Sequence, residues 1–142
     1  MTASPDAPHH QRRFASFTIT GKSLDPEEVS AALSLSPYRA FKAGDKKGTG
    51  DDRWSHGLWS ISTEGVVEAD DLEAHIAWLL HQLEPEKSEL VNVLTEERVK
   101  ARILCFFEME KMNDGVEFSA ALINRLAALD LPVALDIYNS SL

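Results

Sequence analysis

Hydrophobic and polar positions alternate along the chain in two rhythms, which predict strands and helices in turn. Residues 14–20 (FASFTIT), 58–63 (LWSIST), 98–110 and 133–138 (VALDIY) are rich in β-branched and aromatic residues and alternate as strands do. The segments between them repeat apolar residues every three or four positions, which is typical of amphipathic helices. The pattern therefore predicts the order strand, helix, strand, helix, strand, helix, strand.

Capping residues and prolines set the expected limits of the helices. Asp25 suits the start of the first helix, and Pro37 prevents its continuation. Asp70 and Glu73 are spaced for a capping box, so the second helix should begin near residue 71. A proline at position 85 ends or kinks that helix, and residues 85–97 are expected to form a second helical piece.

The order of elements predicts an α+β fold. Each outer strand–helix–strand unit is expected to form a right-handed βαβ crossover, and two such units side by side make a four-stranded sheet with helices on one face. This is a ferredoxin-like arrangement with an extra helical connection between its halves. We expect a disordered tail over residues 1–13 and a single α+β domain over residues 14–142, with a long irregular loop at 37–57.

The alternation also assigns side chains to the two faces of the sheet. We expect the helices to cover the side that carries Ile103, Cys105, Val133 and Leu135. Because exposed apolar side chains at the centre of a sheet are costly, the other face should be covered by the 37–57 loop, a second subunit or a ligand. That second face is predicted to carry Thr18, Ser60, Ser62, Arg102, Leu104, Phe106, Glu108, Asp136 and Tyr138.

Composition narrows the classes of function. The chain has 142 residues, with 14 Lys and Arg against 23 Asp and Glu, and its net charge of −9 argues against a general nucleic-acid binder. Its single cysteine, Cys105, suits a reducing compartment. No apolar run approaches the ~20 residues of a membrane span, so we expect a cytoplasmic protein that does not enter a membrane.

The sequence offers no complete catalytic constellation. Cys105 lies in the middle of a predicted strand, where a buried thiol is inert, and no nucleophile elbow is present. His75 and His81 lie six positions apart on one helix, about 240° around its axis, so they cannot bind one metal ion together. We therefore predict no catalytic residue, no metal and no cofactor, and we interpret His75 as part of the packing.

Four residues are candidates for ligand binding. The 37–57 loop carries an unusual aromatic and cationic load, in which Arg39 and Trp54 could grip an anionic or planar ligand. Packing of this loop back on the sheet as a lid is the alternative interpretation. Asp136 and Tyr138 would line the same pocket from the second face of the sheet.

Several short segments, in this order, resemble the bacterial domain-of-unknown-function 4279 family. They are LDPEEVSAALSLSPYRAFKAGD, GLWSIST, LEAHIAWLLHQLEPEK and LDIY, and the resemblance covers roughly residues 14 to 138. It implies an intracellular single-domain α+β protein and no assigned reaction. The positions that match the family pattern are Pro37, Gly44, Asp45, Trp59, Ser60, His75, Leu83, Pro85, Asp136 and Tyr138.

Two functions are compatible with these observations. The first is a non-enzymatic interaction module that binds a protein partner, or a second copy of itself as a homodimer, through its acidic surface or second sheet face. By analogy of size and charge, immunity- or antitoxin-like roles would suit such a module. The alternative is a small-ligand-binding protein or enzyme with a pocket on the open sheet face.

Overall fold

The computed structural model describes residues 11–96 and 98–139 of the chain. Strands and helices follow one another in the order β1 (Arg13–Gly21), α1 (Pro26–Leu33), β2 (Arg39–Phe41), β3 (Gly57–Ser62), α2 (Leu72–Leu83), a 3₁₀ turn η1 (Glu84–Glu86), α3 (Lys87–Leu94), β4 (Lys100–Met109), α4 (Ala120–Ala128) and β5 (Val133–Asn139). No helix in these two ranges has the length and apolar character needed to cross a membrane.

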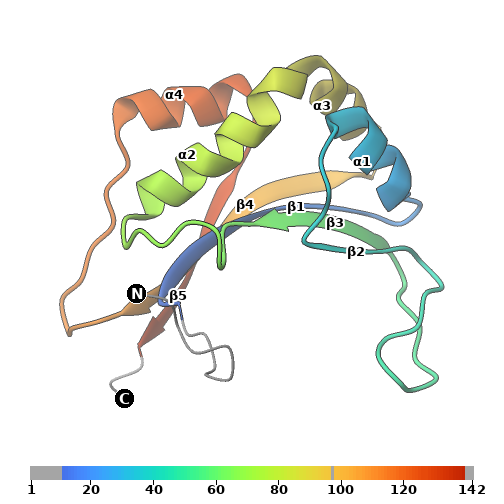
Figure 1. Ribbon diagram of the computed structural model, residues 1–142, viewed down its shortest axis with the longest axis horizontal. Coiled ribbons are helices and arrows are strands. Elements are labelled where there is room, and N and C mark those ends of the chain that lie inside the picture. The colour runs from blue at the N-terminus through green and yellow to red at the C-terminus, as the bar shows by residue number, and fades with distance from the viewer. Residues whose placement is uncertain (1–10, 97, 140–142) are drawn as a thin grey trace.

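The described strands form one mixed sheet of five strands in the order β2-β3-β1-β4-β5. β1 lies in the middle and pairs antiparallel with both β3 and β4. β2 pairs antiparallel with β3 at one edge, and β5 pairs parallel with β4 at the other. Figure 1 shows the labelled helices packed together on one face of this sheet.

The α+β class is confirmed, but the predicted sheet is wrong in its number of strands. The short strand β2 lies within the segment that the sequence assigned to a loop. β1 and β3 are antiparallel neighbours, so the segment from β1 through α1 to β3 is not a βαβ crossover. The two adjacent βαβ units, and with them the ferredoxin-like arrangement, are not confirmed. Within the described chain, β4, α4 and β5 form the one such unit with directly paired parallel strands.

The helices begin where side-chain oxygens accept hydrogen bonds from the free N–H groups of the first turn. Asp25 accepts one from the Glu27 amide at the start of α1, and Ser119 accepts one from the Leu122 amide at the start of α4. At α2 the capping residue is Asp71, one position later than the spacing predicted. Pro85 falls in the 3₁₀ turn that separates α2 from α3, so the extra helical connection is present.

The core lies between the helices and the face of the sheet on which they pack. Phe17, Trp59 and Ile103 from the strands meet a stripe of leucines and one isoleucine from α2, and all of them are fully buried. The Trp59 indole donates a hydrogen bond to the Ser30 hydroxyl at 2.9 Å, which satisfies its buried N–H group. Burying side chains of this size stabilises by roughly 1.5–3 kcal/mol each.

The helix layer ends before it covers the outer strand. Leu135 of β5, which the sequence placed under the helices, is 42% exposed, and Ile137 on the same side is 56% exposed. Ile123 of α4 is 53% exposed. The buried residues of α4 are Leu122 and Leu126, so this helix buries a narrow apolar stripe.

One glycine is required by close packing at the start of β3. A Cβ atom at Gly57 would lie 2.5 Å from the Leu24 carbonyl oxygen, which is backbone that cannot swing aside. The strand can therefore approach the segment before α1 only because residue 57 has no side chain.

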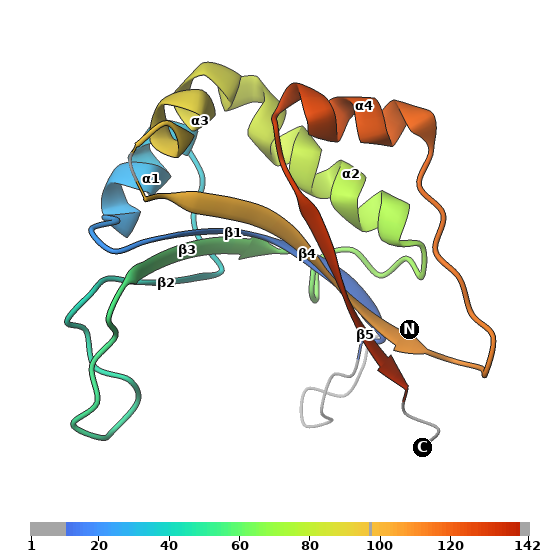
Figure 2. The same ribbon diagram turned by 180° about the vertical axis from the view of Figure 1, so that it is seen from behind.

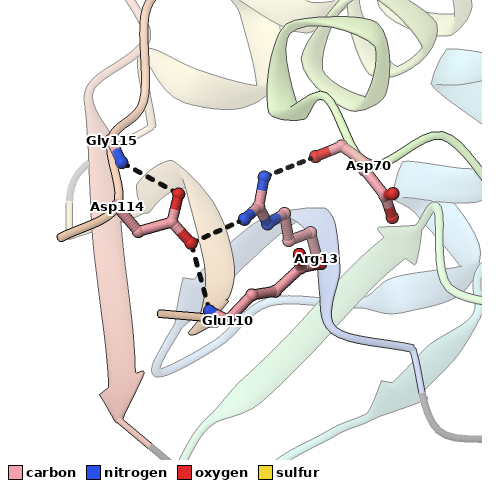
Figure 3. A network of polar contacts seen from close by, with 5 residues as sticks. All are labelled: Arg13, Asp70, Glu110, Asp114 and Gly115. Atoms are coloured by element: carbon pink, nitrogen blue, oxygen red, sulfur yellow. Dashed lines mark hydrogen bonds and ion pairs between the residues drawn. The ribbon is translucent and has the colours of Figure 1, made fainter. Parts of the chain in front are cut away.

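The start of β1 is held in place by a network of contacts around one arginine (Figure 3). Arg13, which the sequence assigned to the tail, is the first residue of β1. Its guanidinium donates to the Asp114 carboxylate at 2.9 Å and to the Asp70 carbonyl at 3.1 Å, and it lies over the Phe107 ring. The network joins β1 to the loops before α2 and α4. Residues 1–10 of the predicted tail lie outside the described residues.

Candidate functional site

The face of the sheet opposite the helices is the inner side of an arch. Figure 2 shows the strands curving beneath the helix layer, and residues 42–56 project away from the sheet at the end where β2 and β3 lie. None of the described helices covers this inner face. We call it the open face.

Strand register places the side chains of the open face in rows that run across the sheet. One row reads Arg39, Ser60, Thr18 and Arg102, from β2 through β3 and β1 to β4. The next row reads Ser62, Ser16, Leu104 and Ala134, from β3 to β5. A third row brings Phe14, Phe106 and Asp136 together. The faces predicted for the side chains of β4 are therefore confirmed, because Leu104 and Phe106 lie on the face away from the helices.

A cavity of about 840 Å³ occupies the open face. This is a volume typical of sites that hold small organic ligands. Its walls combine apolar side chains with a group of hydroxyls from β1 and β3. It is lined by Phe14, Ser16, Thr18, Thr20, Tyr38, Arg39, Leu58, Ser60, Ser62, Glu64, Lys100, Ala101, Arg102, Leu104 and Pro132.

The charge of this cavity is opposite to that of the chain. Its lining includes three cations, Arg39, Lys100 and Arg102, against one carboxylate, Glu64, whereas the whole chain has a net charge of −9. Lys100 and Arg102 are exposed and form no hydrogen bond or ion pair with another described residue. The cavity is therefore a locally positive region with free donors.

Two of the predicted ligand-binding residues meet at the β2 edge. The Trp54 ring stacks on Phe41 with centroids 3.8 Å apart, and the Arg39 guanidinium carbon lies 5.4 Å from each of these two rings. Lys47 approaches the Trp54 ring at 4.7 Å. Contacts of this kind order the projecting segment 42–56, which also carries a bridge between Lys46 and Arg53.

The other two predicted residues meet at the β5 edge. The Tyr138 hydroxyl donates a hydrogen bond to the Asp136 carboxylate at 2.9 Å. This bond, together with the negative charge of Asp136, raises the pKa of the Tyr138 phenol above its ordinary value. The phenol therefore stays protonated, and its O–H group continues to donate to the Asp136 carboxylate.

The four predicted residues do not form one pocket. Arg39 and Trp54 lie at one edge of the sheet and Asp136 and Tyr138 at the other, with β3, β1 and β4 between them. Of the four, Arg39 is the one that lines the cavity. The prediction omitted Lys100 and Arg102 from the site, although the alternation of β4 already placed both on the open face.

The apolar centre of the open face is partly covered by its own neighbours. Phe106 stacks on Phe14 with centroids 4.8 Å apart and contacts Tyr138 at the same distance, so its ring is half-buried within an aromatic row. The 42–56 segment extends from the β2 end of the sheet, and Phe106 lies three strands away on β4. Cover of this face by a ligand or a second subunit stays a prediction.

The described residues hold no group of three or more His, Cys, Asp or Glu side chains placed to bind a metal ion. Cys105 is buried on the helix side of β4, and this burial raises the pKa of its thiol to about 12. His75 is buried too, with both ring nitrogens hydrogen-bonded inside the fold. The polar lining of the cavity consists mainly of cations and hydroxyls, with Glu64 as its one carboxylate.

Comparison with known proteins identifies the family. The chain matches the model of DUF4279, a domain of unknown function, over residues 10–140, which is nearly its whole length. The protein therefore belongs to this family, as the sequence resemblance indicated. No curated protein and no solved structure matches the chain.

Proposed function

We propose that this protein binds a small organic anion in the cavity of its open face. The observation that carries the proposal is the reversal of charge, with three cations and one carboxylate lining a cavity in a chain of net charge −9. Positive charge gathered in a concave site attracts anions and concentrates them locally.

The donors of the cavity support an anionic ligand. The Arg102 guanidinium carries five N–H groups, and an Arg–carboxylate or Arg–phosphate pair is commonly bidentate. Lys100 lies two positions earlier on the same face of β4. Because neither side chain has an acceptor among the described residues, a bound anion would supply the missing partner without breaking a contact within the protein.

The remaining lining supports a ligand with an apolar part. Leu104 and Phe14 lie beyond Arg102 along the open face, and Leu58 lies beside Thr20. Hydroxyls between them offer both donors and acceptors. Binding requires no more than these groups, so a binding protein for an amphipathic carboxylate or phosphate is the function that the geometry supports best.

A thermal-shift screen at low ionic strength tests this function. Organic anions such as octanoate and hexyl phosphate are compared with octanol, which has a similar chain and no charge. An anion present at 100 times its dissociation constant should stabilise the fold by about 2.7 kcal/mol. Arg102→Gln should weaken the effect, and Lys87→Gln, the same change of charge on α3, should leave it unchanged. Equal shifts with octanol, or no shift with any anion, would count against the proposal.

Protein interaction is the second candidate function, and the outer strand β5 favours it. Leu135, Ile137 and Tyr138 of this edge strand are 42%, 56% and 47% exposed. An exposed edge strand with apolar side chains is a template for pairing with another chain, and two copies could pair through it about a two-fold axis. The occupant that we propose is a second copy of this chain.

Light scattering at high micromolar concentration tests the homodimer. A mass near twice 15.8 kDa would support it, and Ile137→Lys should then return the mass to that of the monomer. Ile123→Lys, a change of the same kind at an exposed position of α4, is the control. A monomeric mass at all concentrations would leave β5 without this role.

A further inference from the structure

Arg39 and Arg102 stand at opposite ends of one row of the open face. Arg39 is the register partner of Ser60, Ser60 of Thr18, and Thr18 of Arg102. Three strand-to-strand steps of 4.7–4.9 Å put the two arginine backbones about 14 Å apart across the arch. The residues between them are small, so a ligand chain could lie close to the sheet.

Both guanidinium groups are available to a ligand. Arg39 approaches the Phe41 and Trp54 rings at 5.4 Å. A contact of this kind is made with the face of a ring and leaves the N–H donors of the guanidinium unused. Arg39 and Arg102 are exposed, and neither donates a hydrogen bond to another described residue. Each can therefore pair with one acidic group.

The centre of the row is polar but uncharged. The Thr18 and Ser60 hydroxyls lie 3.1 Å apart and share one hydrogen bond. The Ser60 hydroxyl also donates to the Ile61 carbonyl at 3.5 Å, so both hydroxyl protons are used inside the protein and acceptor capacity remains on the oxygens. A ligand that crosses the row therefore passes from a cation, over hydroxyls, to a second cation.

The direction along the strands toward the C-terminal end of β4 is unsuitable for a second anionic group. From Arg102, the open face of β4 continues to Leu104 and Phe106. Asp136 lies beside Phe106 in the next strand, and Glu64 lines the same side of the cavity. Carboxylates at that end would repel an anion, whereas the cross-strand direction ends on Arg39.

From this arrangement we infer that the ligand is an elongated dianion, with one acidic group paired to Arg39 and the other to Arg102, lying across the strands. The inference rests on the proposed function, because it assigns a ligand class to the same cavity. Dicarboxylates are the simplest members of that class. The chain between the acidic groups must span the row, so affinity should depend on its length.

Isothermal titration calorimetry with acids of different length tests the inference. The probes are succinate, suberate, dodecanedioate and the single-headed octanoate. One of the dicarboxylates should bind at least about tenfold more tightly than octanoate, since its second carboxylate adds a charge-assisted pairing with the other arginine. Arg39→Gln and Arg102→Gln should each reduce the affinity for that dicarboxylate to the level of octanoate. Lys87→Gln is the matched control and should bind as the unaltered protein does.

The outcomes separate this inference from the proposed function. If octanoate binds as tightly as every dicarboxylate and Arg39→Gln changes neither, the dianion is overturned while anion binding stands. If none of the four acids binds, both fall. Arg39→Lys and Arg102→Lys keep the charge but lose the bidentate geometry, so a partial loss of affinity in these variants supports pairing at each end. Unchanged circular dichroism in all variants shows that the fold is retained.

Discussion

Thr63 and His75 share a hydrogen bond inside the molecule, with 2.6 Å between the Thr63 Oγ1 and His75 Nδ1 atoms. The other ring nitrogen, Nε2, lies 2.6 Å from the Ala69 carbonyl oxygen. Because a carbonyl only accepts, Nε2 carries a proton there. The Ala15 amide donates to the same Thr63 oxygen at 2.9 Å. The pair thus joins β1, the end of β3 and α2.

Replacing Thr63 by Val should destabilise the fold. The change keeps the shape of the side chain but leaves the Ala15 N–H group and the His75 Nδ1 atom without a partner. A buried polar group without a partner costs about 1–3 kcal/mol. The free energy of unfolding, measured in urea, should therefore fall by at least about 1 kcal/mol. Thr95→Val, at an exposed helix end, is the control and should change it by less than about 0.5 kcal/mol. Equal effects at both positions would contradict the role of the buried pair.

Cys105 should not react while the protein is folded. Its pKa of about 12 keeps the thiol protonated near neutral pH, and the thiolate is the form that reacts. Its side chain is also fully buried. An aromatic disulfide reagent at mildly alkaline pH should therefore label the native protein slowly, and label it completely once urea is added. Rapid labelling of the native protein would show that β4 opens or is exposed.

Asp114 should make the fold sensitive to acid. Hydrogen bonds from backbone amides, with that of Glu110 the largest cause, and the nearby Arg13 charge hold the pKa of its carboxyl below the ordinary value. A lowered folded pKa stabilises the native state fully above the ordinary pKa of ~3.9, and this stabilisation is lost as the pH falls through the folded pKa. Asp114→Asn should therefore unfold more easily at neutral pH.

The difference in urea midpoint between Asp114→Asn and the unaltered protein should shrink as the pH falls below about 4. Asp51→Asn, in the exposed tip of the 42–56 segment, is the control and should follow the unaltered protein at every pH. A constant difference for Asp114→Asn across this range would mean that its carboxyl charge does not stabilise the network.

Trp54→Ala should loosen the projecting segment 42–56. The change removes the stack with Phe41 and the contacts with Arg39 and Lys47, and an aromatic pair is worth about 0.5–1.5 kcal/mol beyond its buried area. Limited trypsin digestion should cut the variant faster at Lys46, Lys47 or Arg53. Met112→Ala, at an exposed apolar residue elsewhere, should be cut at the rate of the unaltered protein. An unchanged cleavage rate for Trp54→Ala would show that backbone hydrogen bonds, and not the contacts of Trp54, hold this segment in place.

The long strands could be predicted from the sequence because their side chains alternate over many residues. β4 has apolar residues on both faces, as a strand in the interior of a sheet does. β2 could not be predicted, because three residues show no periodicity and the strand exists only through its pairing with β3. Its pairing runs from Arg39 opposite Ser60 to Phe41 opposite Leu58, next to a bond from the Tyr38 amide to the Ser60 carbonyl.

The candidate site could be predicted only in part, because the alternation of side chains within one strand does not reveal which strands are its neighbours in the sheet. The faces of Arg102, Asp136 and Tyr138 followed from alternation. Their neighbours did not, and Asp136 lies at the opposite edge from Arg39. The two arginines share a row because β3 and β1 lie between them, which is a property of the long-range pairing alone.

The central place of β1 makes the growing chain more vulnerable than the finished protein. β1 is synthesised before both of its neighbours, and its Phe14 pairs with Phe106 near the far end of the sequence. On the ribosome, β1 and β3 can pair while the other edge of β1 stays open until β4 emerges. An unpaired edge with apolar side chains readily joins another chain. Pausing of translation between β3 and β4 should therefore be the stage at which aggregates form.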